Sequence, residues 1–382
     1  MHVIIAGAGI AGLTAAAAFV RDGHKVTVLE QRHDTAAGAG ITLWPNALAA
    51  LDRIGLGEAT RAVSARIEGG VIRWQDGSTI RRPAHGAMVH ALGEPLAVLR
   101  RSALRDVITD ALPKHTVRYG TAVTAAFTSG DGAAVVTSDG QRLPADLVVA
   151  ADGTRSALAN RFNPGLVHTY TGYSAWRGIA DLQIDPRLAG QVVGRLSEFG
   201  AVPLREGQTY WFGTVRLPEN TQFGDESSQV RALASRWPEP IAAVVAATSR
   251  DQTSRTDLYD RPLARSWSDG SVVLVGDAAH PMRPHLGQGG CQAIEDAVVL
   301  AAAIAKYADV GRSLERYEAV RKPRARKIAT QSRTIGRIVG ARPPVVFGNS
   351  MRASRLVPNA LFLRHLATIA GKSAIEKQLS SL

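Results

Sequence analysis

Residues 276–290, with the sequence GDAAHPMRPHLGQGG, place an aspartate, two histidines and an arginine among several glycines. Asp277, His280 and His285 are residue types that bind metal ions. The histidines, however, lie five residues apart in a proline-containing loop, and no other cluster of histidine and cysteine accompanies them. A serine hydrolase would need a G-x-S-x-G turn after a strand, which the sequence lacks. Neither a metal site nor a serine nucleophile is therefore favoured here. We expect the nearby Cys291 to pack as a small apolar residue.

Near the N-terminus, Gly7, Gly9 and Gly12 form the pattern G-x-G-x-x-G between the apolar stretch VIIA and a predicted helix. These glycines permit a tight turn, the approach of a pyrophosphate and close packing of helix on sheet. The helix N-terminus adds unpaired N–H donors. Glu30 ends the next predicted strand, 18 residues after Gly12, where its carboxylate can accept hydrogen bonds from a ribose. The carboxylate favours NAD or FAD over NADP, but the motif does not distinguish NAD from FAD.

The elements that position these residues follow from apolar runs in the sequence. The first 33 residues predict a βαβ unit, with the strands HVIIAG and KVTVLE on either side of a helix. DLVVAADG (146–153) is a continuous apolar run, which is typical of a central parallel strand buried on both faces. SVVLVGD (271–277) resembles it, and we expect this strand to return to the same sheet.

Turn signals and changes of pattern define the remaining architecture. Asp76-Gly77 and Asp139-Gly140 each separate two β-prone segments and predict hairpins. Residues 168–216 read as strands of an antiparallel sheet, and long helices follow Gly289. We expect residues 1–70, 98–165 and 268–310 to form a nucleotide-binding domain, 71–97 and 166–267 an antiparallel-sheet substrate domain, and 311–382 a basic helical segment.

The net charge of +12 has a local origin. Residues 321–382 contain 13 Lys and Arg against the single acid Glu376, so the rest of the chain is neutral on balance. Solvated helix faces explain this charge, although nucleic acid, an anionic membrane and phosphate-bearing ligands are alternatives. Residues 3–20 lack charge, but their glycine spacing and the absence of a preceding basic region argue against a signal peptide or membrane span. A single cysteine is typical of a protein in the reducing cytosol, so we expect a cytoplasmic protein. We also expect that it binds no nucleic acid.

Several motifs together resemble those of single-component FAD-dependent aromatic monooxygenases, such as p-hydroxybenzoate and salicylate hydroxylases. They are GAGIAG…LEQR, VLRRSALRDVI, VVAADGTRSAL, YTGYSAWRG and GDAAHPMRPHLGQGGCQAIEDA, and they span residues 3 to about 340. The resemblance implies an α/β fold in which a Rossmann-like FAD-binding domain is interleaved with an antiparallel-sheet substrate domain and followed by C-terminal helices. The length of 382 residues suggests the compact branch of the family, without an additional C-terminal domain.

The resemblance also implies the reaction. NAD(P)H visits transiently and reduces FAD, O2 adds at C4a, and the resulting C4a-hydroperoxyflavin hydroxylates or epoxidises an aromatic or polycyclic small molecule. An FAD-dependent reductase or dehydrogenase without oxygen insertion is the alternative enzyme. A flavin-bound binding or regulatory protein is the alternative outside enzymes. The oligomeric state, monomer or homodimer, stays open.

Individual residues acquire expected roles from the resemblance. Glu30 binds the adenosine ribose, Arg101 contacts the pyrophosphate or ribityl region, Asp152 supports the cofactor, and Asp277 holds ribityl hydroxyls. The full set of expected cofactor contacts is Gly7, Gly9, Ala11, Gly12, Glu30, Gln31, Arg32, Arg101, Val123, Asp152, Asp277, Pro284, Gly287, Gly289 and Gly290. The helix that begins near Gly289 directs its positive end at the flavin ring.

The substrate is expected between the flavin and the antiparallel sheet. The candidates to line its pocket are Trp176, Arg177, Phe199, Tyr210 and Phe212. Strand alternation places Tyr210 and Phe212 on one face, and Tyr210 could hydrogen-bond a substrate oxygen. Arg177 or Arg283 is available for an anionic substituent. Arg283 and His285 depart from the residues common in the family at these positions, so we predict that with Tyr210 they act at the catalytic site.

Overall fold

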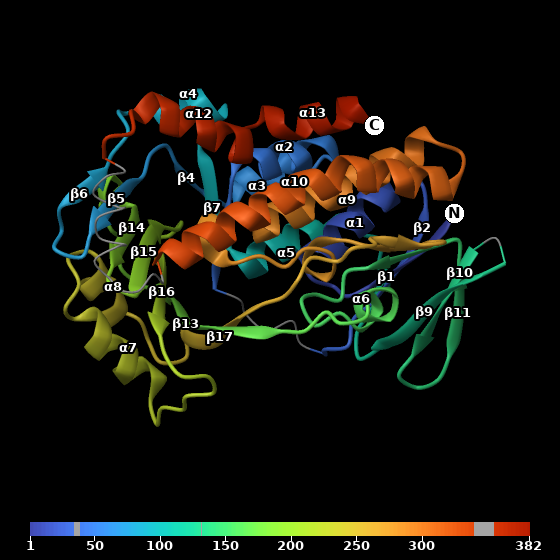
Figure 1. Ribbon diagram of the computed structural model, residues 1–382, viewed down its shortest axis with the longest axis horizontal. Coiled ribbons are helices and arrows are strands. Elements are labelled where there is room, and N and C mark those ends of the chain that lie inside the picture. The colour runs from blue at the N-terminus through green and yellow to red at the C-terminus, as the bar shows by residue number, and fades with distance from the viewer. Residues whose placement is uncertain (34–38, 131, 340–354) are drawn as a thin grey trace.

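The computed structural model describes residues 1–33, 39–130, 132–339 and 355–382 (Figure 1). Its first sheet has six strands in the order β18-β19-β12-β1-β2-β8. They are β1 (His2–Ala6), β2 (Lys25–Leu29), β8 (Val117–Arg118), β12 (Leu147–Ala150), β18 (Ser268–Asp269) and β19 (Val272–Leu274). All neighbouring pairs are parallel except β18–β19. The carboxyl ends of β1, β2, β12 and β19 therefore meet at one edge, where ligands bind in open α/β sheets.

Helices bury this parallel sheet. α1 (Ile10–Arg21) packs on α9 (Gly289–Lys306) and on α5 (Arg101–Asp110), while α2 (Pro45–Arg53) packs on α9. The shared core contains fully buried side chains of β1, β12, β19, α1 and α9. This burial explains why β1 and β12 are continuous apolar runs rather than alternating strands.

The second sheet has seven strands in the order β17-β13-β16-β15-β14-β5-β6. They are β5 (Val71–Trp74), β6 (Thr79–Arg81), β13 (Thr169–Ala180), β14 (Gly190–Gly194), β15 (Ser197–Pro203), β16 (Thr209–Arg216) and β17 (Thr253–Asp260). Pairing is antiparallel except between β14 and β5. One face packs on α7 (Glu226–Ala234) and α8 (Ile241–Ala246) (Figure 1). The other face shares a second apolar cluster with the loop that precedes α9.

Two three-stranded sheets and several short helices complete the connections. One sheet contains β9 (Val123–Ser129), β10 (Gly132–Thr137) and β11 (Arg142–Ala145), and the other contains β3 (Gly40–Leu43), β4 (Ala65–Ile67) and β7 (Leu96–Arg100). The short helices are α3 (Gly57–Ala62), α4 (Ala87–Leu92), α6 (Ala157–Phe162) and the 3-10 turns η1 (Pro186–Leu188), η2 (Gly276–Ala278) and η3 (Pro284–Leu286). Turns η2 and η3 form the loop between β19 and α9.

Three helices occupy the described C-terminal part of the chain. They are α10 (Val310–Val339), α12 (Asn359–Ala370) and α13 (Ser373–Ser381). α10 packs on α9 and reaches η3 beside the seven-stranded sheet (Figure 1). α12 packs on α4, and α13 packs on α2 and α9. The long helix α10 thus contacts both the nucleotide-binding core and the loop at the edge of the second sheet.

The predicted α/β class, with parallel and antiparallel sheets and C-terminal helices, is confirmed. Asp76-Gly77 lies in the β5–β6 turn and Asp139-Gly140 in the β10–β11 turn. The uncharged N-terminal run is strand β1 followed by the buried helix α1. Within the described ranges, no helix has the length and hydropathy needed to cross a bilayer.

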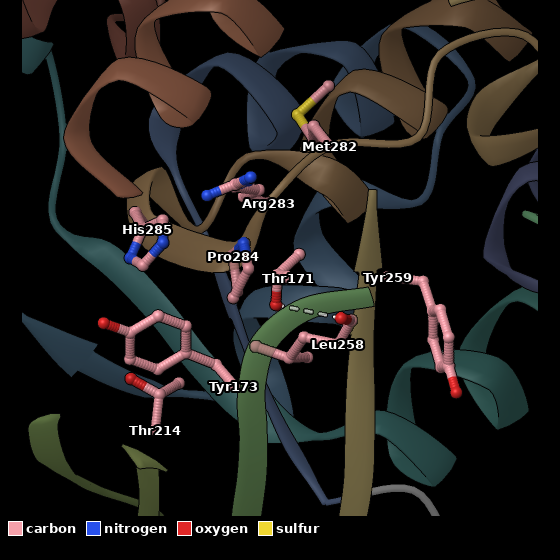
Figure 2. A pocket seen from close by; sticks show the side chains of 9 residues that line it. All are labelled: Thr171, Tyr173, Thr214, Leu258, Tyr259, Met282, Arg283, Pro284 and His285. Carbon is pink, nitrogen blue, oxygen red and sulfur yellow. Dashed lines mark hydrogen bonds between the residues drawn. The ribbon is translucent and has the colours of Figure 1, made fainter. Parts of the chain in front are cut away.

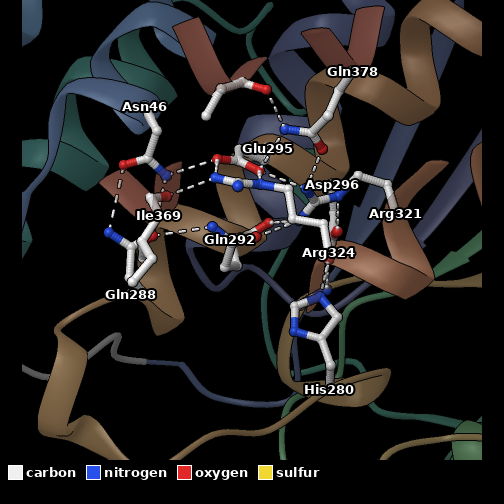
Figure 3. Close-up of polar contacts among 12 residues, drawn as sticks. Asn46, His280, Gln288, Gln292, Glu295, Asp296, Arg321, Arg324, Ile369 and Gln378 are labelled. Atoms are coloured by element: carbon white, nitrogen blue, oxygen red, sulfur yellow. Dashed lines mark hydrogen bonds and ion pairs between the residues drawn. The ribbon is translucent and has the colours of Figure 1, made fainter. Parts of the chain in front are cut away.

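A buried network of charged side chains fixes the first half of α9 (Figure 3). The carboxylates of Glu295 and Asp296 are fully buried, and Arg321 from α10 forms ion pairs with both. The Asp296 Oδ2 atom also accepts a hydrogen bond from the Gly276 N–H at 2.7 Å and contacts His280 Nε2. The Asp296 carboxylate therefore holds the loop between β19 and α9 to helix α9, and Arg321 of α10 compensates its charge.

Three further side chains complete the environment of Glu295. Arg324 Nε donates to Glu295 Oε2 at 2.7 Å, and Asn46 Nδ2 donates to Oε1 at 2.7 Å. Gln378 Nε2 donates to Oε2 at 2.9 Å. Burial alone raises the pKa of Glu295, but Arg324 and Arg321 outweigh it and lower this pKa to about 2. The buried carboxylate stays ionised, and each of its partners depends on its charge.

We expect Glu295→Gln to lower the free energy of unfolding by about 3–5 kcal/mol, because it removes the counter-ion of Arg324 and one of the two counter-ions of the buried Arg321. Glu376→Gln is the matched control. Glu376 pairs with Arg53 at the surface, where both side chains are about half exposed, so its loss changes stability by less than about 1 kcal/mol. Urea unfolding monitored by tryptophan fluorescence measures both variants. Equal effects of the two substitutions would contradict the prediction.

The same carboxylate predicts a pH dependence of stability. Its folded-state pKa of about 2 lies below the ordinary value of 4.5, so the unfolded chain binds the proton more readily. The contribution of Glu295 is fully present above pH 4.5 and is lost as the pH falls from 4.5 toward 2. We therefore expect the stability difference between the wild-type chain and Glu295→Gln to shrink over this window. Urea titrations at a series of pH values test this, and a constant difference would refute it.

Candidate active site

The glycine motif forms the turn between β1 and α1, and its glycines meet different demands. Gly7 has a φ of +104°, and a Cβ atom there would lie 2.5 Å from the carbonyl oxygen of Ala151. A Cβ on Gly12 would lie 2.0 Å from the carbonyl oxygen of Gly7. A Cβ on Gly9, in contrast, meets no atom of the described residues within 4 Å, and no side chain caps the helix that begins there. Packing thus explains Gly7 and Gly12, whereas Gly9 leaves space beside free N–H donors, as a pyrophosphate requires.

Glu30 follows β2 and faces this turn. Its Oε2 atom accepts a hydrogen bond from the Ala8 N–H at 2.7 Å, and its Oε1 atom accepts one from the Arg32 N–H at 2.9 Å. An ionised carboxylate accepts about four hydrogen bonds, so Glu30 keeps capacity for ribose hydroxyls while it is anchored to the backbone. Of the other residues expected around the adenosine, Gln31 and Arg32 are exposed beside it, and Val123 is half-buried at the start of β9.

Two acidic residues follow β12 and β19 at the same sheet edge. Thr154 Oγ1 donates to Asp277 Oδ2 at 3.2 Å and so joins the two loops. Asp152 Oδ2 accepts a hydrogen bond from the Leu158 N–H at 3.4 Å, whereas its Oδ1 atom is buried without a partner in the described part of the chain. Burial raises the pKa of Asp152. Because an orphaned buried oxygen is unfavourable, a bound group that donates to it fits this position.

Arg101, Arg177 and Tyr210 lie near these loops. Arg101 begins α5 and is exposed, yet burial lowers the pKa of its guanidinium, with Asp277 opposing this shift and Arg177 adding to it. Arg177 donates to Thr256 Oγ1 at 2.9 Å from the seven-stranded sheet. Positive charge therefore gathers where the sheet faces the cofactor loops.

The N-terminus of α9, like that of α1, has no side-chain cap. Its N-cap residue is Gln288, and no side chain accepts from the first turn. Among the described residues, a Cβ on Gly289 would approach only Met282, at 3.8 Å. The end of this 18-residue helix thus presents N–H donors and positive potential to an electron-rich ring edge. The predicted contacts in this stretch are Pro284 and Gly287, which are exposed, and Gly289 and Gly290, which are half-buried.

Ala11, also predicted to contact the cofactor, is half-buried in the first turn of α1. A Cβ on Gly276 would lie 2.9 Å from the Ala11 methyl group. Gly276 also has a φ of +60°, which favours glycine. The glycine turn after β1 and the turn after β19 thus pack directly against each other.

A small cleft, open to solvent, lies between the loop before α9 and the seven-stranded sheet (Figure 2). One wall is formed by the loop and the other by β13, β16 and β17. The lining residues are Thr171, Tyr173, Thr214, Leu258, Tyr259, Met282, Arg283, Pro284 and His285. In Figure 2, Tyr173 and Thr214 approach His285 from the sheet. Apolar walls with a few polar groups are the usual character of a small-molecule site.

Arg283 and His285 line this cleft, and both are also held by carboxylates of the sheet. Arg283 Nη2 lies 3.1 Å from Asp260 Oδ2. His285 Nδ1 lies 3.0 Å from Oε1 of the buried Glu198. The two side chains therefore bind the cofactor-side loop to the second sheet. Their predicted roles toward a substrate stay a prediction.

The prediction that Trp176 and Phe199 line the substrate pocket is wrong. Both are buried on the opposite face of the sheet, in the core under α7 and α8. Trp176 Nε1 donates to Glu226 on that side. Arg177 pairs with Phe212 in the register of β13 and β16, so these two share a face, and Trp176, one residue away, points to the other. Tyr210 and Phe212, with ring centroids 6.0 Å apart, do lie on the face toward the cleft.

Sequence reasoning missed several residues of the cleft. Tyr173 lies four residues before Arg177 in the same strand, so alternation places both on one face. This signal was present in the sequence. Glu198 and Asp260 carried no such signal, because their role depends on partners in a distant loop.

Among the described residues, no group of histidine, cysteine or acidic side chains is arranged to hold a metal ion. His280 is buried against Asp296, and His285 lies on Glu198, so the two histidines have separate partners. Burial raises the pKa of the Cys291 thiol to about 12, so this cysteine is a neutral, packed side chain.

Comparisons with known proteins agree with this site. The family model for the FAD binding domain matches residues 1–332. The aurachin C monooxygenase/isomerase of Stigmatella aurantiaca is 37% identical over 342 residues, covering 88% of this chain and 89% of the relative. The 3-amino-4-hydroxybenzoate 2-monooxygenase PtnB3 of Streptomyces platensis is 36% identical, covering 88% and 87%. The crystal structure of Klebsiella pneumoniae HpxO complexed with FAD and uric acid superposes with a TM-score of 0.88 at 27% identity, covering 97% of this chain and 96% of that one.

The chain belongs to the family of FAD-dependent aromatic monooxygenases. It is therefore a flavoprotein that uses NAD(P)H as co-substrate. Bound FAD supplies the redox chemistry and the activation of oxygen, whereas the protein supplies binding and orientation. The uncapped turn at Gly9, the carboxylate of Glu30, the orphaned oxygen of Asp152 and the helix start at Gly289 fit this cofactor.

We expect Gly9→Ala to weaken FAD binding by at least about tenfold, because the new methyl group occupies space needed by the pyrophosphate. The unfolding temperature of the FAD-free protein should stay near the wild-type value, since Gly9 has an ordinary φ of −74° and open space. Gly12→Ala is the contrasting control and should destabilise the FAD-free protein. Flavin fluorescence titration and thermal unfolding measure the two effects. Wild-type FAD affinity in Gly9→Ala would refute the assignment.

Proposed function

We propose that this enzyme hydroxylates or epoxidises an aromatic or polycyclic small molecule held between the cofactor and the seven-stranded sheet. The observation that carries the proposal is the cleft itself, because the loop between β19 and α9 forms one of its walls. That loop also leads into the uncapped N-terminus of α9, which we expect to face the cofactor. A substrate in the cleft would therefore lie beside the reactive ring, with the loop on one side and the sheet on the other.

Tyr210 lies on the same sheet face as the cleft, beyond its lining residues, and is the proposed hydrogen-bond donor to a substrate oxygen that extends toward it. Its side chain is only 8% exposed, and burial raises its pKa although Arg177 acts in the opposite direction. The phenol therefore stays protonated at neutral pH and can donate its proton in a hydrogen bond. Phe212 packs beside it and adds an apolar surface for an aromatic ring.

Arg177 and Arg101 favour a substrate with an anionic or electron-rich substituent. Both guanidinium groups lie near Tyr210. Arg177 is only half-buried, so its guanidinium remains accessible for a carboxylate or phenolate.

We also propose that the reaction takes place in the cytoplasm, which suits a chain whose single cysteine is buried and reduced.

The test is to purify the protein, record its visible spectrum and screen aromatic compounds for accelerated oxidation of NADH and NADPH. With an active compound, 18O2 labelling should place one oxygen atom in the product. Substrate oxidation without incorporated label would instead support a reductase or dehydrogenase. Flavin binding without accelerated oxidation by any aromatic compound would support a binding protein.

We expect Tyr210→Phe to lower kcat/KM for an active substrate by about ten- to a hundredfold, because a positioned hydrogen bond is lost while the ring is kept. FAD content and unfolding temperature should not change. Tyr119→Phe is the control, because Tyr119 is 40% exposed at the surface. Steady-state NAD(P)H oxidation measures both variants. A wild-type rate in Tyr210→Phe would remove this residue from the mechanism.

A further inference from the structure

Arg261 directly follows β17 and cross-links the two loops that carry Asp152 and Asp277. Its side chain is 1% exposed. Its Nη1 atom donates to the Thr154 carbonyl at 3.1 Å, and its Nη2 atom donates to the carbonyls of Asp277 at 3.1 Å and Ala278 at 2.7 Å. A single guanidinium group thus holds the loop after β12 and the loop after β19 together.

The preceding residue, Asp260, binds the other segments around the site. Its Oδ2 atom accepts hydrogen bonds from Arg283 Nη2 at 3.1 Å and from Arg333 Nε at 3.0 Å. Arg283 belongs to the loop before α9, and Arg333 belongs to α10. Two adjacent residues at the end of one strand therefore connect the substrate sheet to both cofactor loops and to the long helix.

The chemistry of Arg261 is unusual for a residue whose role is packing alone. Its hydrogen bonds to Thr154, Asp277 and Ala278 go to backbone carbonyls, and its compensating charges are Asp277 and Asp152. Burying a guanidinium group is costly, and an apolar side chain would fill the same volume without that cost. A planar fork of donors, however, is suited to holding several carbonyl groups in a fixed relative geometry.

We propose that Arg261 is a positioning residue for FAD. Because the peptide unit is planar, fixing the carbonyls of Thr154, Asp277 and Ala278 also fixes the orientation of the peptide groups that they belong to. Those peptide groups adjoin the acidic side chains that we expect to face the cofactor. Arg261 thus acts on the flavin through the loops and does not touch it. This inference depends on FAD binding and not on the identity of the substrate.

The test uses Arg261→Lys in the full-length protein. Lysine keeps the positive charge but lacks the fork that spans both loops. We expect the Kd for FAD to rise by about tenfold, with an altered midpoint potential and an altered visible circular dichroism of the bound flavin. Arg255→Lys is the matched control on the same strand. Arg255 is also largely buried but pairs with Glu226 and Asp257, away from the cofactor loops.

Arg255→Lys should lower the unfolding temperature without changing FAD affinity or midpoint potential. The proposal is overturned if Arg261→Lys also lowers only the unfolding temperature. If Arg261→Lys does not fold, Arg261→Gln carries the test, because a glutamine amide can still donate to one loop carbonyl but cannot span both loops. A severalfold rise in the Kd for FAD supports the proposal, and an unchanged Kd rejects it.

Discussion

The paired carboxylates of Glu295 and Asp296 are the constraint on which the site depends. They lie in the first half of α9, fully buried, and helix α10 provides the guanidinium group that compensates both. Asp296 also accepts the Gly276 N–H and so fixes where the loop after β19 turns. The direction of α9, and with it the position of its uncapped N-terminus, follows from charges that cannot be rearranged without exposing an ion to an apolar interior.

This constraint also explains why the C-terminal helices matter for a cofactor site formed by the N-terminal and central parts of the chain. Arg321 comes from α10 and Gln378 from α13, yet both act on Glu295 in α9. Part of the positive charge of the C-terminal segment therefore lies inside the protein, where it compensates buried carboxylates. Solvated helix faces account for only a share of it, because Arg324 is also largely buried against Glu295.

Much of the fold could be predicted because local and long-range signals agree. The apolar runs at β1, β12 and β19 predict parallel strands. A glycine turn directly after a strand indicates a place where a phosphate can approach the backbone. The cofactor end of the site follows from these patterns. The cleft on the side of the seven-stranded sheet does not follow from these patterns. The alternation of side chains divides each strand into two faces, but it does not indicate which face meets the loop before α9. Trp176 and Arg177 are neighbours with opposite environments, and only the packing of α7 and α8 decides between them.

Substrate selectivity in such a site cannot be assigned to single loop residues. His285 lies on the buried Glu198, which also accepts hydrogen bonds from Gln191 and Thr214 of neighbouring strands. Changing His285 alone would leave the buried Glu198 carboxylate without its histidine partner. The resulting loss of stability opposes the change even where it would improve substrate binding. The loop and the sheet must therefore change together. The unusual loop residues therefore form one half of an interface. The other half is distributed over strands of the seven-stranded sheet that are distant from the loop in the sequence.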